Sequence, residues 1–113
     1  MNMKLSEALR KGAEMINWRQ CFGNMFTWHI IKEKVNINSA CAIGCIALGM
    51  GRSPEQQGPG WWGWSMEDCV PNENMRHLLM YRNDIARDSL EEILHLLELM
   101  ESEDEISTKE VSC

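Results

Sequence analysis

Apolar residues fall on one face of a helix at the start of the chain. The residues of this face are Leu5, Ala8, Leu9, Ala13 and Ile16. Because charged residues occupy most of the positions between them, the spacing predicts an amphipathic helix over residues 5–18. Gly12 lies on or beside the apolar face, where its missing side chain predicts the close approach of another helix.

The segment 39–50, SACAIGCIALGM, has almost no polar side chain. A helix that is apolar all round is buried on most sides, so this segment predicts the central helix of the fold. Ser39 is its expected N-cap and Gly51 its expected stop. The preceding segment, 26–37, is rich in aromatic and β-branched residues, and it fits a short β element as well as a short helix.

A long loop over residues 51–71 separates this helix from the C-terminal half of the chain. Asn72 is placed to cap a helix over residues 73–82. The segment NDIARD, residues 83–88, is expected to break that helix, because it combines turn-forming side chains with no apolar periodicity.

A last helix is expected over residues 89–101, where Ser89 and Glu92 have the spacing of a capping box. Its apolar face consists of Leu90, Ile93, Leu94, Leu97 and Met100. Leu96 and Leu99 widen this face beyond a single stripe. The wider face predicts burial on two sides, which a homodimer through this helix would provide.

Together these elements predict a mainly α fold. We expect a single domain over residues 1–101, with about four helices packed round the apolar helix 39–50 and room for a short β element near 26–37. A chain of 113 residues has the size of one domain. Residues 102–113 are acidic and non-periodic, and they are expected to form a disordered tail.

The net charge of −6 is unevenly spread along the chain. Residues 1–37 hold six Lys and Arg against three acids, whereas residues 88–113 hold nine acids against Lys109. This asymmetry argues against direct binding of nucleic acid and favours a protein partner with a basic surface. The N-terminus carries charge where a secretory signal would be apolar, and the longest uncharged run is too polar and too short to span a membrane. A cytoplasmic location is therefore expected.

Five cysteines, in a chain without an export signal, indicate reduced thiols. Cys41 and Cys45 lie four residues apart on a helix, and buried packing is the ordinary interpretation of such a pair. The alternative is a zinc site that Cys69 and His77 would complete. A further alternative is an enzyme in which Cys41, activated at a helix N-terminus, acts as nucleophile with His29 or His77 as base. No cofactor and no catalytic residue are assigned.

Two other groups of side chains are candidates for binding a partner. Trp61, Trp62 and Trp64 lie in the glycine-rich stretch GPGWWGWSM, where they either plug the core or present an aromatic face. Glu91, Glu98 and Glu101 lie on the expected last helix and would meet a basic surface. His95, between two of these glutamates, is expected on a solvated face.

Three stretches resemble a group of small uncharacterised proteins encoded by phages and their bacterial hosts. LSEALRKGAEM, ACAIGCIALG and YRNDIARDSLEEILHLLE are similar to the KLSEAIR-x-GA opening, the CALGA-like helix and the LND…SxExI closing helix of that group. The resemblance covers about half of the chain and implies a phage or mobile-element gene acting in a bacterial cytoplasm. The resemblance implies no chemistry. From the charge asymmetry, within this setting, we expect a small acidic, non-catalytic interaction protein that binds, and thereby inhibits, a host protein such as a nucleic-acid-handling complex.

Overall fold

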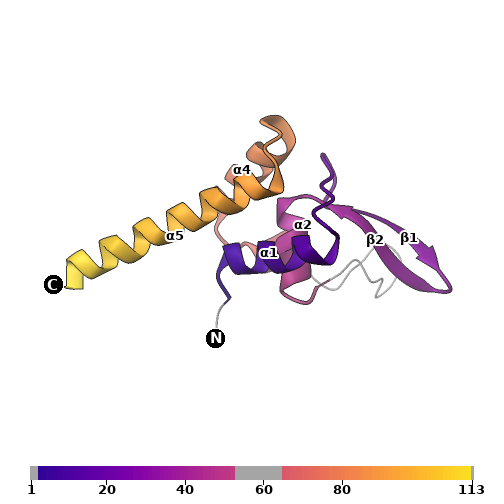
Figure 1. Cartoon of the computed structure of the whole chain (residues 1–113), viewed down its shortest axis with the longest axis horizontal. Helices are drawn as coiled ribbons and strands as arrows, with labels where there is room; N and C mark the ends of the chain where they lie inside the picture. Colours follow the sequence, from indigo (N-terminus) through magenta and orange to yellow (C-terminus); the bar gives the residue numbers. More distant parts are fainter. Residues whose placement is uncertain (1–2, 53–64, 113) are drawn as a thin grey trace.

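The computed structural model describes residues 3–52 and 65–112, with the backbone alone for 103–112 (Figure 1). The helices are α1 (Leu5–Met15), α2 (Ala42–Gly49), α3 (Met66–Cys69), α4 (Glu73–Met80), the π-helical η1 (Tyr81–Ile85) and α5 (Leu90–Ser112); the strands are β1 (Phe26–Ile31) and β2 (Lys34–Ala40). The mainly α class is confirmed. The segment 26–37 lies in an antiparallel β-hairpin and not in a helix.

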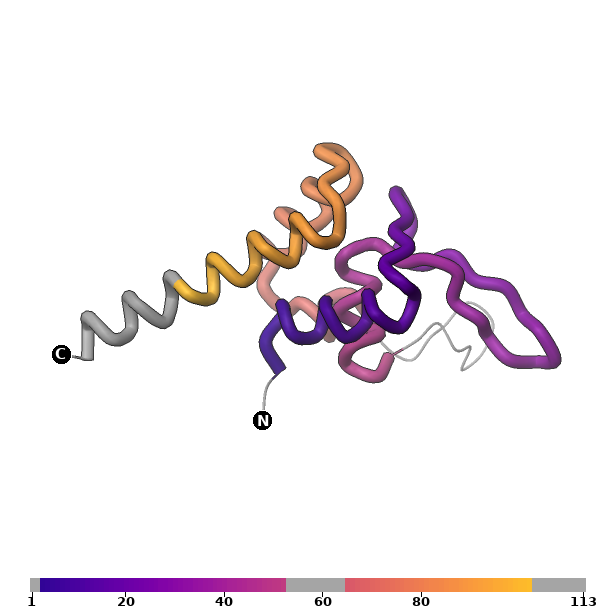
Figure 2. The backbone as a smooth tube through the Cα atoms, viewed as in Figure 1, coloured from indigo at the N-terminus to yellow at the C-terminus, as the bar shows by residue number. Residues whose placement is uncertain are grey.

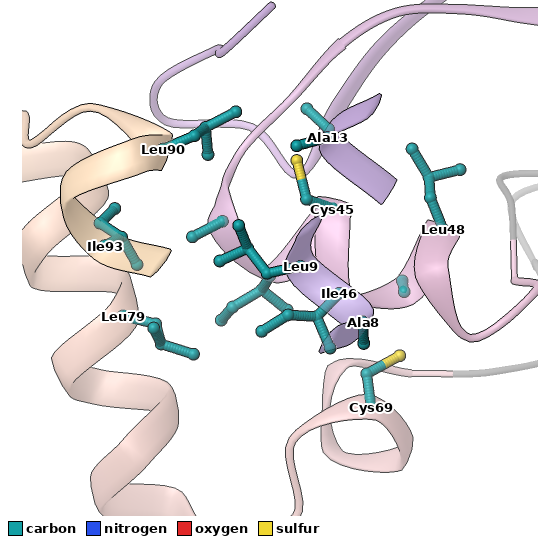
Figure 3. Packing of buried hydrophobic residues seen from close by; sticks show 14 of the residues in the cluster. Ala8, Leu9, Ala13, Cys45, Ile46, Leu48, Cys69, Leu79, Leu90 and Ile93 are labelled. Carbon is teal, nitrogen blue, oxygen red and sulfur yellow. The ribbon is translucent and has the colours of Figure 1, made fainter. Parts of the chain in front are cut away.

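Helices α1 and α2 cross so closely that only glycine fits at two points of contact. A Cβ atom added to Gly12 would lie 1.8 Å from the carbonyl oxygen of Cys45, and one added to Gly49 would lie 1.9 Å from that of Ala8. The close approach predicted at Gly12 is therefore confirmed. Every residue of α2 is buried, and Leu9 of α1 packs beside Ile46 of α2 (Figure 3).

The N-cap of α2 is Cys41 and not Ser39, which corrects the sequence-based expectation. The Cys41 sulfur accepts a hydrogen bond from the Gly44 N–H at 3.4 Å. Ser39 lies in β2, and because the next residue, Ala40, still pairs with Phe26, the helix cannot begin before residue 41.

The stop at Gly51 is confirmed. Gly51 has a φ of +84°, its N–H bonds to Leu48, and the Arg52 N–H bonds to Ala47. These two bonds form a Schellman motif, in which a left-handed residue ends the helix. Two equivalent bonds, from the Asn17 N–H to Glu14 and from the Trp18 N–H to Ala13, end α1 at Met15, three residues before its predicted end. This end is possible because Asn17 adopts a φ of 54°.

The hairpin turns through Lys32 and Glu33, whose φ values of 50° and 65° match a type I′ turn. Trp28 pairs with Ile37, and Ile30 pairs with Val35. Residues directly opposite each other, and residues two apart along a strand, share a face of the sheet. Trp28, Ile30, Val35 and Ile37 therefore form one apolar strip, which begins against the core at Ile37 and continues along a hairpin that projects from the body (Figure 1).

The expected break between the last two helices falls later than predicted. The chain remains helical through η1, and it then reverses direction into α5 (Figure 2). Arg87, with a φ of 56°, lies at this reversal. The expected Asn72 cap is confirmed by a bond from the Met75 N–H at 2.9 Å, and helix α3 is an additional element within the long loop.

Helix α5 begins as predicted, with the Ser89 hydroxyl bonded to the Glu92 N–H and the Glu92 carboxylate bonded to the Ser89 N–H. Its predicted apolar face is buried at Leu90, Ile93, Leu94 and Leu97. The helix extends beyond its predicted end at residue 101, because no glycine or proline interrupts residues 90–112 and glutamate favours helix. The assignment of residues 102–113 to a separate tail stays a prediction. No helix in the described part of the chain is long and apolar enough to cross a membrane.

Candidate protein-interaction site

The three glutamates predicted to bind a partner have different surroundings in the structure. Glu101 accepts hydrogen bonds from both the backbone N–H, at 3.2 Å, and the hydroxyl of Ser6. Ser6 lies in the first turn of α1, whose N-cap residue is Lys4, a side chain that has no acceptor atom. Glu101 therefore caps α1 from α5 and links the two helices.

Glu98 also faces α1. Its carboxylate lies 3.1 Å from the Arg10 guanidinium, and the side chains of both residues are about half exposed. Exposed ion pairs contribute little to stability, so Glu98 retains charge that an external partner could use. Glu91 lies two helical turns before Glu98 on α5 and is also exposed.

The outward face of α5 consists of Glu91, Glu92, His95, Leu96 and Leu99. Its first turns border an open hollow of about 470 Å³, which is also lined by Arg82 and Asp88. Hydrogen bonds with Ser89 lower the pKa of Glu92, so this carboxylate stays charged. Three carboxylates and only one arginine give the hollow an excess of negative charge. His95 is exposed on this face, as predicted.

A second exposed surface lies at the hairpin and was missed by sequence reasoning. Ile30 is 64% exposed, Ile31 is 51% exposed, and Trp28 is 38% exposed. Lys32 and Lys34 lie at the tip and are both exposed. The alternation of apolar and polar residues along 26–37 indicates such a surface only if the segment is a hairpin. Because the same residues also fit a helix, the sequence alone did not reveal it.

Asn83 of η1, which is 1% exposed, makes four side-chain hydrogen bonds. Its carbonyl oxygen accepts bonds from the Gln20 amide at 2.8 Å and from the Ala42 N–H at 3.0 Å. Its amide donates to the Cys21 carbonyl at 3.0 Å and to Asp84 at 2.7 Å. Asn83 thus joins η1, the segment before β1 and the start of α2. Sequence reasoning missed this role, since an Asn-Asp pair is equally typical of a turn.

The predicted thiol alternatives are not supported by the structure. Among the described residues, no three His, Cys, Asp or Glu side chains form a group that could hold a metal, so Cys41, Cys45, Cys69 and His77 do not assemble the proposed zinc site. Loss of hydration raises the pKa of the Cys41 thiol to about 11, against an ordinary value of 9.0. The expected activation at a helix N-terminus is therefore wrong, because desolvation outweighs the bond from Gly44.

The other described cysteines are similarly unreactive. Burial also raises the pKa of Cys21, Cys45 and Cys69, and the Arg52 guanidinium, 3.7 Å from the Cys69 sulfur, only partly offsets this effect. His29 and His77, the bases considered for Cys41, are both exposed. These thiols thus have the protonated, buried character of packing residues.

Trp61, Trp62 and Trp64 lie outside the described residues, so their predicted role in binding stays a prediction. No protein-family model matches this chain, and neither the curated proteins nor the solved structures contain a match. Function must therefore be inferred from the two exposed surfaces of the chain itself.

Proposed function

We propose that the chain is a small, non-catalytic interaction protein that binds a protein with a basic surface through the outward face of α5. The observation that carries this proposal is the acid-lined hollow bordered by Glu91, Glu92 and Leu96. Leu99, which is 50% exposed, follows about one turn further along α5. Carboxylates around an exposed apolar side chain combine electrostatic steering with apolar burial on contact.

The resemblance to phage and host proteins suggests a bacterial cytoplasm as the setting. The acidic charge of the C-terminal part of the chain suggests a nucleic-acid-handling protein as the target. Such proteins present basic grooves, which an acidic helix can occupy in place of nucleic acid. On this proposal the chain inhibits its target by covering the groove. Trp61, Trp62 and Trp64 are proposed to contribute aromatic contacts.

We also propose that α2 is the packing centre of a domain formed by residues 1–101. Support comes from the burial of all residues from Ala42 to Gly49, and from the contacts that α1, α3 and α4 make with this helix. On this proposal the distal part of the hairpin and the outward face of α5 project from this body, whereas Phe26 and Ala40, at the base of the hairpin, belong to its core.

The experiment for the binding function is affinity capture from a bacterial lysate, compared across matched charge variants. Glu91→Lys should abolish capture of the specific partner, and high salt should weaken capture by the unmodified chain. Glu14→Lys makes the same charge change in the last turn of α1, where a cation is tolerated, and should leave capture intact. If both variants lose partner capture equally, or if Glu91→Lys leaves capture unchanged, this face is not the binding site.

A further inference from the structure

The segment before β1 runs parallel to the end of β2 and brings two cysteines to neighbouring positions. Gln20 pairs with Ala40 in a parallel bridge. The Cys21 N–H bonds to the Ala40 carbonyl at 3.1 Å, and the Ala40 N–H bonds to the Arg19 carbonyl at 3.0 Å. Cys21 and Cys41 each follow the bridged pair by one residue. Because bridged segments lie about 5 Å apart, the backbones of the two cysteines are close together.

The two segments separate only beyond these cysteines. In a continuous parallel ladder the Cys21 carbonyl would accept the bond of the Ala42 N–H. Here Asn83 lies between the two groups, since its amide donates to Cys21 at 3.0 Å and its oxygen accepts from Ala42 at 3.0 Å. The Cα atoms of Cys21 and Cys41 therefore fall between the close contact at Ala40 and the wider one at Asn83. This placement matches the Cα separations of about 4.4–6.8 Å that disulfides span.

Both thiols also lie on the same side of the paired segments. Successive side chains of an extended segment alternate, so residues one position past a bridged pair point the same way. Ser39 lies two residues before Cys41 in extended backbone and shares its side, and the Ser39 hydroxyl hydrogen-bonds with the Cys21 sulfur. Burial raises the pKa of Cys41 most, and the charge of the nearby Cys21 thiolate raises it further. Both observations place the two sulfur atoms near each other.

We propose that Cys21 and Cys41 form a disulfide within the chain when it meets a disulfide oxidant such as glutathione disulfide. Both are free thiols in this structure. Cys41 is partly exposed, whereas Cys21 is 9% exposed, so Cys41 reacts first.

The exchange takes two steps. The Cys41 thiolate attacks one sulfur of glutathione disulfide, which forms a mixed disulfide and releases one glutathione. The Cys21 thiolate then attacks the Cys41 sulfur and releases the second glutathione. The two protein thiols lose two electrons and two protons, and the two released glutathione molecules take them up.

Burial makes this exchange slow and its product durable. Because burial raises the pKa of both thiols, little thiolate is present at neutral pH to attack the oxidant. A reduced pair without a stabilised thiolate also has no energetic advantage over its disulfide, unlike the acidic thiols of strongly oxidising proteins. The pair is thus a modification site for sustained oxidation and not a catalytic thiol. This inference goes beyond the proposed function and does not depend on the outward face of α5.

The disulfide joins the base of the hairpin to the start of α2. The loop from Cys21 to Cys41 contains both strands, and closing it removes conformational entropy from the unfolded chain. The Cys21 thiol gives up its hydrogen bond to the Asn24 carbonyl, at 3.2 Å, when the new bond forms. Because the backbone already holds the two residues together, the melting temperature should rise by roughly 5 °C or more on oxidation.

Mass spectrometry of the native full chain, incubated with glutathione disulfide, tests the pairing. The expected product has lost two hydrogen atoms, and after tryptic cleavage its disulfide links residues 20–32 to residues 35–52. Because the second peptide also contains Cys45, matched variants identify the partner. Cys41→Ser should abolish the link, whereas Cys45→Ala should retain it. The same oxidation in urea should give mixed pairings, because the bridge between the two segments is lost.

Four results would overturn the proposal. These are a chain that does not react or stops at the mixed disulfide with glutathione, a link that persists in Cys41→Ser, the same pairings in urea as in native buffer, and an oxidised chain that melts below the reduced one. The last would show that the native backbone does not accommodate the bond. Circular dichroism checks that each variant folds. If Cys41→Ser does not fold, Cys21→Ser provides the same test, because it should also abolish the link.

Discussion

Isoleucine side chains are buried at the α1–α2 crossing but exposed on the hairpin. Ile43 and Ile46 of α2 are 1% and 0% exposed, whereas Ile30 of β1 is 64% exposed. At the crossing, two glycines bring backbone against backbone, so the apolar residues of both helices are enclosed. In the hairpin, the apolar strip continues past the edge of the body. The difference shows that residue type alone does not decide burial; the shape of the surrounding backbone does.

The crossing should be the most sensitive part of the molecule. Gly49→Ala places a Cβ within 1.9 Å of the Ala8 carbonyl oxygen, and the backbone of a buried helix cannot move aside cheaply. We expect a loss of about 3 kcal/mol or more in the free energy of unfolding, measured by urea denaturation. Gly23→Ala is the control, since its added Cβ would meet nothing within 4 Å. It should cost only about 1–2 kcal/mol, from its positive φ. Equal losses would mean that α1 and α2 are not in close contact.

Truncating one isoleucine on each side of the comparison measures the difference directly. Ile46→Ala should cost about 2–5 kcal/mol, because it leaves a cavity in α2. Ile30→Ala, on the exposed strip, should cost less than about 1 kcal/mol. A large loss for Ile30→Ala would remove the distinction between the two regions.

Asn83 connects the α1–α2 crossing to the rest of the fold. The stability lost on removing its side chain should therefore lie between the losses expected for the crossing and for the exposed strip. Asn83→Ala leaves the Ala42 N–H and the Cys21 carbonyl without this partner in a buried site, and should cost about 2–3 kcal/mol. Asn36→Ala removes a single bond to the Lys34 carbonyl on the exposed hairpin and should be nearly neutral. Thermal melting of both variants, followed by circular dichroism, would show whether the asparagines differ in this order.

The cap that α5 provides to α1 should contribute less. Glu101→Ala removes both bonds to Ser6 and is expected to cost about 1 kcal/mol, as for other helix N-caps. Glu98→Ala breaks only the exposed ion pair with Arg10 and should cost less than about 0.5 kcal/mol. If urea denaturation instead gives the larger loss of stability for Glu98→Ala, the ion pair with Arg10 is the main connection between α1 and α5.

The smallest effect is expected from shortening the chain. A chain that ends at Ser102 keeps Glu101 and all the buried leucines of α5. Its melting temperature should therefore remain nearly unchanged. A clear drop in the melting temperature would show that residues 103–113 belong to the packed domain.

Local signals predicted several elements correctly. The spacing around Leu9 and Leu94 predicted which faces are buried, and the caps at Asn72 and Ser89 were recognised because capping uses residues only a few positions apart. Gly12 was also recognised, since glycine weakens a helix and is favoured on its apolar face where a second backbone comes close. Each of these inferences depends on the residues within one or two helical turns.

Long-range interactions were the ones that sequence reasoning missed. Asn83 bonds to partners 41 and 63 residues away, so no local pattern distinguishes it from a turn asparagine. The expected activation of Cys41 was wrong for the same reason, because the burial that raises its pKa comes from elements far away in sequence. The projecting hairpin was missed because exposure depends on where the body ends, and residues 26–37 contain no signal for that.

Hydrogen exchange tests most directly the claim that α2 is the packing centre of the body and that the hairpin projects beyond it. Amides of α2 should exchange at the rate set by global unfolding. Amides of His29 and Asn36, a hydrogen-bonded pair of the projecting hairpin, should exchange much faster. Hairpin amides as well protected as those of α2 would contradict the account.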